Sequence, residues 1–156
     1  QLVYGEALLT EEEDYQEAVR ILGRELKNYR RRGTDLIFLG HGTEHIANAS
    51  YSRLQEKFWQ EGYLDCLVGT VEASELAEQV EVLVKKRHSH WVVLVPFLVV
   101  AGEHVCRDIA GEQENSWKSR FLRNGYQVEC VLKGLGEYKG IRQMYIRHAR
   151  EAEKNY

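Results

Sequence analysis

The stretch Leu36-Ile37-Phe38-Leu39-Gly40-His41-Gly42 joins an apolar run to a histidine between two glycines. Two more nearly unbroken apolar runs lie further along the chain, at 64–71 and 91–95. Such runs are typical of strands that are covered on both faces in a parallel sheet, so we expect these three to be the central strands. Apolar and polar residues alternate over 126–132, which predicts a fourth strand nearer an edge of the sheet.

Helical patterns fill the intervals between these runs. Thr10 and Glu13 have the spacing of a capping box, and the apolar periodicity that follows predicts a helix over about 11–32. The other expected helices cover about 48–61, 73–87, 103–123 and 139–153. This alternation predicts an α/β fold, an open and mainly parallel four-stranded sheet with helices on both faces. We expect one domain over 1–156, in which 1–33 is a connecting segment and helix and 34–156 carries the sheet and its covering helices.

Composition excludes several classes of protein. A chain of 156 residues is long enough to bury a core without disulfides, and its net charge of −3 provides no basic field for nucleic acid. No apolar run approaches the roughly 20 residues that a membrane-spanning helix requires. The three cysteines, Cys66, Cys106 and Cys130, have no CxxC spacing, which favours a reducing compartment, and we expect a cytoplasmic protein.

Three potential metal ligands directly follow predicted strands. His41 follows the first strand, Glu72 the second, and His104 follows the third through a short segment. Because ligands of open α/β sheets bind beyond the carboxyl ends of the strands, we expect these side chains at one edge. Two imidazoles and a carboxylate suit Co, Ni, Fe or Zn. The glycines beside the two histidines leave space for a close approach.

Each of these residues also has an ordinary structural interpretation. A histidine after a strand is commonly a hydrogen-bonded loop residue, and an acidic residue such as Glu72 stabilises the start of the helix that follows. His45 and Tyr51 could face the same cavity in an outer layer. The remaining histidines, His88, His90 and His148, are expected at the surface. The residues alone therefore leave the metal site as one of two interpretations.

A series of longer motifs occurs in one order along the chain. They are Gly40-His41-Gly42-Thr43, Asn48-Ala49-Ser50-Tyr51, Gly69-Thr70-Val71-Glu72, Val95-Pro96-Phe97-Leu98-Val99-Val100-Ala101-Gly102-Glu103-His104, Asp108-Ile109-Ala110-Gly111, Asn115-Ser116-Trp117-Lys118-Ser119 and Lys133-Gly134-Leu135-Gly136-Glu137. Together they resemble the anaerobic sirohydrochlorin cobaltochelatase family. The resemblance extends over nearly the whole chain.

The resemblance implies a class II chelatase that inserts Co(II) into the tetrapyrrole sirohydrochlorin for cobalamin synthesis, without ATP or another nucleotide. Some relatives also accept iron, and the ligand set would also suit Ni(II). By position, His41 and His104 match the family's metal-binding histidines, and Glu72 matches a glutamate that joins them in some members. We expect the histidines to assist proton removal and Glu72 to balance charge or accept a proton.

A substrate wall is also expected next to these ligands. We expect Phe97, Leu98 and Val99 to form an apolar surface for the macrocycle, although residues at the end of a buried strand are more often core. Gly42 and Gly102 would leave room for the substrate beside it.

The resemblance covers one half of the family's fold. Members have two similar α/β halves with the tetrapyrrole between them, and this chain resembles the carboxyl-terminal half, so we expect one half of a two-domain fold and one wall of the cleft. The absent amino-terminal half or a second copy of the chain would supply the other wall. The alternative is a module that binds or carries a divalent metal without chelatase activity. A nucleotide-binding domain is disfavoured because no glycine-rich phosphate loop follows the first strand.

Overall fold

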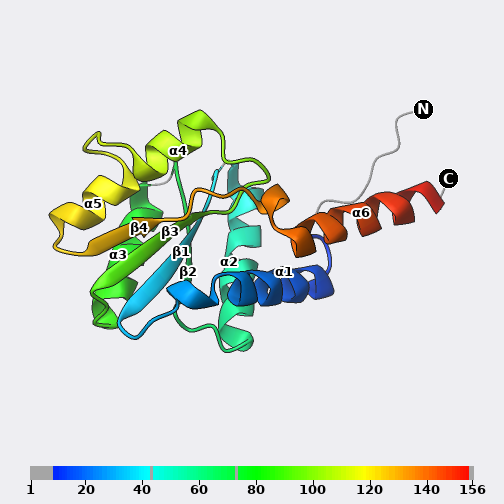
Figure 1. The fold of residues 1–156 in the computed structure, drawn as a ribbon, viewed down its shortest axis with the longest axis horizontal. Coiled ribbons are helices and arrows are strands. Elements are labelled where there is room, and N and C mark those ends of the chain that lie inside the picture. Colours follow the sequence, from blue (N-terminus) through cyan, green and yellow to red (C-terminus); the bar gives the residue numbers. More distant parts are fainter. Residues whose placement is uncertain (1–8, 43, 73, 155–156) are drawn as a thin grey trace.

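A computed structural model describes residues 9–42, 44–72 and 74–154, with the backbone alone described at 44–48 and at 74 and 75. Its centre is one parallel sheet of four strands in the order β2-β1-β3-β4 (Figure 1). The strands are β1 (Thr34–Gly40), β2 (Cys66–Thr70), β3 (Trp91–Pro96) and β4 (Gln127–Cys130). The predicted α/β fold, the parallel sheet and the edge position of the fourth strand are confirmed.

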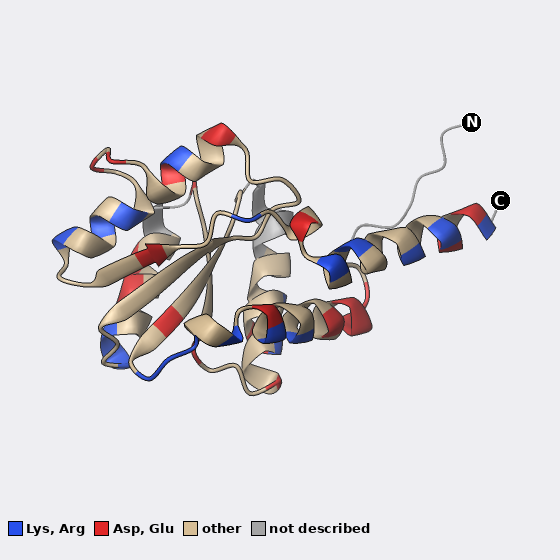
Figure 2. Ribbon diagram, in the orientation of Figure 1, with Lys and Arg blue, Asp and Glu red and all other residues tan. Residues whose placement is uncertain are grey.

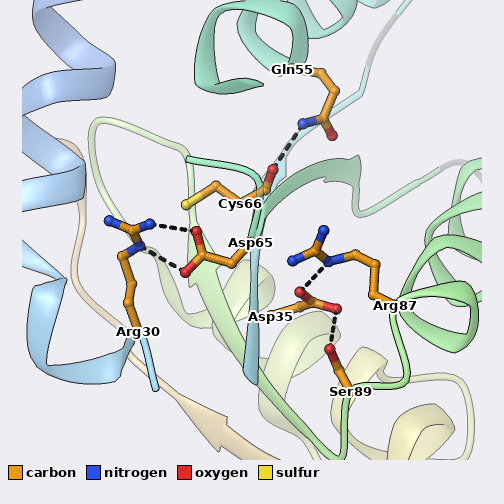
Figure 3. A network of polar contacts seen from close by, with 7 residues as sticks. All are labelled: Arg30, Asp35, Gln55, Asp65, Cys66, Arg87 and Ser89. Carbon is orange, nitrogen blue, oxygen red and sulfur yellow. Dashed lines mark hydrogen bonds and ion pairs between the residues drawn. The ribbon is translucent and has the colours of Figure 1, made fainter. Parts of the chain in front are cut away.

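The prediction that the second apolar run forms a central strand is wrong, because β2 lies at the other edge of the sheet. Its open side is partly occupied by the side chain of Gln55. The Gln55 amide donates to the carbonyl of Cys66 and accepts from the N–H of Val68, both at 2.8 Å (Figure 3 draws the first of these bonds). Helices cover both faces of β2, so its apolar pattern is that of a central strand.

Helices lie on both faces of the sheet, as predicted (Figure 1). On one face, α1 (Glu12–Glu25), α2 (Glu44–Gln60) and α6 (Lys139–Lys154) share a core with inward residues of β1 and β3. In this core Phe38 of β1 stacks on Phe58 of α2. On the other, α3 (Ser74–Lys86), α4 (Glu103–Ala110) and α5 (Trp117–Arg123) enclose a second core that contains Trp117 and Phe121. Short 3-10 turns cover Lys27–Tyr29 (η1) and Leu135–Glu137 (η2).

Two predicted helices differ from the observed ones in extent. The helix predicted over 103–123 is two helices, since Ser116 caps α5 by accepting from the N–H of Ser119 at 3.0 Å and donates to the carbonyl of Gly111 at 2.6 Å. The helix predicted over 11–32 ends at Glu25 and continues as η1. The predicted capping box of Thr10 and Glu13 is also displaced by one residue, because Glu11 is the N-cap residue and pairs with Asp14.

Ion pairs and hydrogen bonds stabilise the amino ends of β1 and β2 (Figure 3). Fully buried Asp35 accepts hydrogen bonds at 2.7 Å from Arg87 and from the Ser89 hydroxyl. Arg30 donates two bonds of 2.7 Å to Asp65, directly before β2. Burial raises the pKa of the Asp35 carboxyl, although the bonds from Arg87 and Ser89 oppose this effect. These contacts fix the end of the sheet opposite to the predicted metal ligands.

Charges of both signs share the outer faces of the helices (Figure 2). Several oppose one another across elements, as in the bidentate contact of Arg147 with Glu17, which joins α6 to α1. None of the helices in the described residues is long and apolar enough to pass through a bilayer.

Candidate metal centre

The three predicted metal ligands follow three neighbouring strands. Since β1 lies between β2 and β3, His41 occupies the middle position, with Glu72 after one neighbour and His104 beyond the other. The backbone ladder continues to the edge of the sheet. The N–H of Val71 donates to the carbonyl of Gly40 at 2.8 Å, and that of Phe97 donates to Leu39 at 2.7 Å. Regular hydrogen bonding thus ends one residue before His41 and one residue before Glu72.

His41 and Glu72 meet across the ends of β1 and β2. His41 Nδ1 lies 3.5 Å from Glu72 Oε1, and the two side chains are 52% and 53% exposed. Two ligand atoms that each lie about 2.1 Å from a tetrahedral ion are about 3.4 Å apart. The observed separation therefore fits two ligands of one ion, and both groups are open to solvent.

His104 does not join this pair. Its side chain is exposed in the first turn of α4, which begins after Gly102. Among the described residues, no group of three His, Cys, Asp or Glu side chains is arranged to hold a metal ion. The structure thus brings together His41 and Glu72, and the participation of His104 stays a prediction. The side chain of His45 lies outside the described residues.

The predicted apolar wall divides between core and surface. Phe97 is only 8% exposed and packs in the core, which is the alternative that its place at a strand end favours. Leu98 is half-buried, and Val99 is 51% exposed. Val100, which was not singled out in the sequence, is 75% exposed. The surface that faces solvent between β3 and α4 is therefore formed by Leu98, Val99 and Val100.

A turn after β4 supports this apolar surface. The N–H groups of Leu135 and Gly136 donate to the carbonyls of Leu98 and Val99 at 2.7 and 3.0 Å. A β-carbon added at Gly134 would lie 2.6 Å from the Val99 carbonyl oxygen. The segment 134–137 thus holds the segment before His104. The sequence signal for such a role is a pair of glycines separated by one residue.

The two glycines predicted to leave room for substrate differ in their surroundings. Gly42 has a φ of +79°, and a β-carbon there would lie 2.5 Å from Thr70 Cβ, so the protein itself requires glycine. A β-carbon at Gly102 would meet no atom of the described residues within 4 Å. The open space at Gly102 adjoins the exposed apolar surface.

The three remaining histidines differ in exposure, and Cys66 and Cys106 are wholly or partly buried. His88 and His90 are exposed, as predicted, but His148 is buried and faces Asp14, so its predicted surface position is wrong. Cys66 is buried in the core, and burial raises the pKa of its thiol. Cys106 is half-buried, and its Sγ donates to the carbonyl of Ala101 at 3.4 Å.

Comparisons with known proteins agree with the resemblance of the motifs. The family model described as cobalt chelatase (CbiK) matches residues 2–154. The sirohydrochlorin cobaltochelatase of Salmonella typhimurium is 31% identical over 154 residues, which are 97% of this chain and 56% of that protein. The sirohydrochlorin cobaltochelatase CbiKC of Nitratidesulfovibrio vulgaris is 30% identical over 145 residues, 92% of this chain and 51% of that protein. The chain thus spans about half the length of these curated relatives. The family model covers nearly all of the chain, which also has the parallel sheet and the histidine His41 at its carboxyl edge. This chain therefore belongs to the cobalt chelatase family.

Proposed function

We propose that this chain forms one half of a chelatase that inserts Co(II) into sirohydrochlorin. The observation that carries the proposal is the contact of His41 with Glu72 at the carboxyl edge of the sheet. The names of the two relatives supply the metal and the tetrapyrrole. The exposed apolar surface next to His104 supports the tetrapyrrole as substrate, because a flat macrocycle needs apolar contact on its face.

The substrate metal would be held by few protein atoms. His41 and Glu72 supply one nitrogen and one oxygen, which leaves coordination positions open for incoming pyrrole nitrogens. We propose His104 as the third ligand. Its side chain is exposed, so a change of rotamer can bring it toward the ion without disturbing the core. A loosely completed shell favours transfer of the metal over storage.

Insertion also requires that two pyrrole nitrogens lose their protons. A neutral imidazole accepts a proton through a ring nitrogen, and a carboxylate accepts one through an oxygen. We propose that His41 and His104 take up these protons as the metal leaves them. Glu72 balances the positive charge that then accumulates at the edge. No step of this scheme uses a nucleotide.

The macrocycle would rest on the apolar surface of Leu98, Val99 and Val100. The open space at Gly102 lets the ring approach the backbone between this surface and His104. This arrangement is one wall of a cleft. We propose that a second α/β half or a second copy of the chain supplies the opposite wall.

The family name favours cobalt, and the two imidazoles and one carboxylate would also accept Fe(II) or Ni(II). All three cysteines are free thiols. They suit a reducing compartment such as the cytoplasm.

The decisive experiment mixes the chain with sirohydrochlorin and Co(II) and follows the visible spectrum of the macrocycle. We expect cobalt insertion to be lost in His41→Ala and His104→Ala and to be kept in His90→Ala, an exposed histidine outside the site. Equal rates in all three variants would contradict the proposal. Co(II) binding without any change in the tetrapyrrole spectrum would instead favour a metal carrier.

A further inference from the structure

The turn that presents His41 is held from two sides by side chains outside the proposed ligand set. Gly40 and Gly42 flank His41, and neither has room for a β-carbon. A β-carbon at Gly40 would overlap the phenol of Tyr51, and one at Gly42 would lie 2.5 Å from Thr70 Cβ and 2.8 Å from its Oγ1. Tyr51 and Thr70 thus occupy the spaces that side chains on this turn would take.

Both of these residues are themselves fixed by the fold. Tyr51 lies on α2, and its half-buried ring packs against the core on that face of the sheet. Thr70 is the last residue of β2, and its side chain is fully buried. The turn is therefore braced by a helix on one side and by the neighbouring strand on the other. A ligand on such a turn is preorganised in direction.

Among the described residues, the Thr70 hydroxyl has no hydrogen-bond partner, although it is fully buried. An unpaired buried hydroxyl is destabilising, and valine would fill the same space without that cost. Within packing distance of the hydroxyl lies the Gly42 backbone, one residue from His41. A hydroxyl at this place needs only a small shift of the turn to find a backbone partner.

We propose that Tyr51 and Thr70 are positioning residues for His41, and that the Thr70 hydroxyl bonds to the Gly40–Gly42 turn when a metal ion joins His41 to Glu72. The inference rests on the proposed role of His41 as a ligand of the substrate metal. Tyr51 sets the direction of the turn before the metal binds. The Thr70 hydroxyl stabilises the loaded state more than the empty state, which couples the end of β2 to metal affinity.

The test compares Thr70→Val with Thr70→Ser by Co(II) titration, followed through the visible absorption of the bound ion. We expect Thr70→Val to melt at the same or a higher temperature than the unaltered chain and to bind Co(II) about tenfold more weakly. Thr70→Ser keeps the hydroxyl and should retain the unaltered affinity. Thr34→Val is the matched control, because Thr34 is buried at the opposite end of β1.

A second measurement examines His41 in the metal-free protein. Ring nitrogen signals of 15N-labelled histidine, assigned with His41→Gln, should move in Tyr51→Leu and stay in place in Tyr51→Phe, which keeps the ring. An unchanged His41 signal in a folded Tyr51→Leu protein would contradict the role of Tyr51. If this variant does not fold, the Thr70 series decides the proposal.

Unaltered Co(II) affinity in Thr70→Val, or equal losses in the valine and serine variants, would overturn the inference. Neither readout contains a tetrapyrrole. Failure of cobalt insertion into sirohydrochlorin, with these responses intact, would therefore remove the proposed function and leave the positioning of His41 in place.

Discussion

His148 Nε2 lies 2.9 Å from Asp14 Oδ1, and this buried contact joins the last helix, α6, to the first turn of α1. The other oxygen of Asp14 accepts the backbone N–H groups of Thr10 and Glu11, at 3.3 and 3.1 Å. The carboxyl group thus serves the start of one helix and a side chain of another, 134 residues away in the sequence.

Removal of this imidazole should destabilise the fold. We expect His148→Ala to lower the free energy of unfolding by about 1 to 3 kcal/mol, because one oxygen of a buried carboxylate loses its side-chain donor. Urea denaturation followed by circular dichroism measures the change. His90→Ala removes an exposed histidine and should change stability by less than about 0.5 kcal/mol. Equal stability of the two variants would show that the α1–α6 contact contributes nothing.

Asp14 should also make the fold sensitive to acid. Burial alone would raise the pKa of this carboxyl, but hydrogen bonds from Glu11, His148 and Thr10 outweigh burial and lower it below its usual value. Because the folded-state pKa is the lower one, the contribution of Asp14 is complete above the unfolded pKa of about 3.9. It is lost as the pH falls through the folded value.

The corresponding variant is Asp14→Asn. Its stability deficit relative to the unaltered chain should be present at about pH 5 and should shrink as the pH falls from there to below about 4. Urea denaturation over this range measures the difference. A deficit that does not depend on pH would mean that the charge of Asp14 does not stabilise the fold.

The sequence predicts the features that depend on local patterns. Apolar runs predicted β1 and β3 because a strand that is buried on both faces is apolar at nearly every position. A second rule, that the carboxyl ends of parallel strands lie at one edge of the sheet, places His41 and Glu72 together. Pattern alone did not place β2 at the edge, because the covering group is the single side chain of Gln55.

Contacts between distant segments were beyond such patterns. The partner of His148 lies at the other end of the chain, so the helical stripe of α6 gives no sign of its burial. The docking of Gly136 on Val99 is likewise set by how two loops meet in space. The proposed approach of His104 to the metal would depend on a side-chain rotamer, which no sequence pattern determines.

The end of α3 contains a strained histidine whose replacement should stabilise the protein. His88 has a φ of +55°, and its N–H donates to the carbonyl of Lys85 at 3.1 Å, in the position where glycine usually ends a helix. His88→Gly should raise the free energy of unfolding by about 0.5 to 1 kcal/mol, because glycine adopts this conformation without a steric penalty. Gly125→Ala is the reverse case: φ is +87° with open space around it, and stability should fall. Thermal melts of both variants provide the comparison, and a loss of stability in His88→Gly would contradict the strain.

Gly134 and Gly102 both adjoin the exposed apolar surface, and their alanine variants distinguish packing against the protein from contact with a substrate. Gly134→Ala would place a methyl group 2.6 Å from the Val99 carbonyl oxygen, so we expect a loss of about 1 to 3 kcal/mol in stability and displacement of the apolar surface. In Gly102→Ala the methyl group would lie more than 4 Å from every other atom in the described part of the chain, its two sequence neighbours aside, and the change should cost less than about 1 kcal/mol. If the macrocycle passes over Gly102, the same methyl should nevertheless slow cobalt insertion by about tenfold or more. Urea denaturation and the spectroscopic insertion assay, applied to both variants, measure the two effects. Full insertion activity in Gly102→Ala would move the macrocycle away from this edge of α4, whereas loss of activity at unchanged stability places it there.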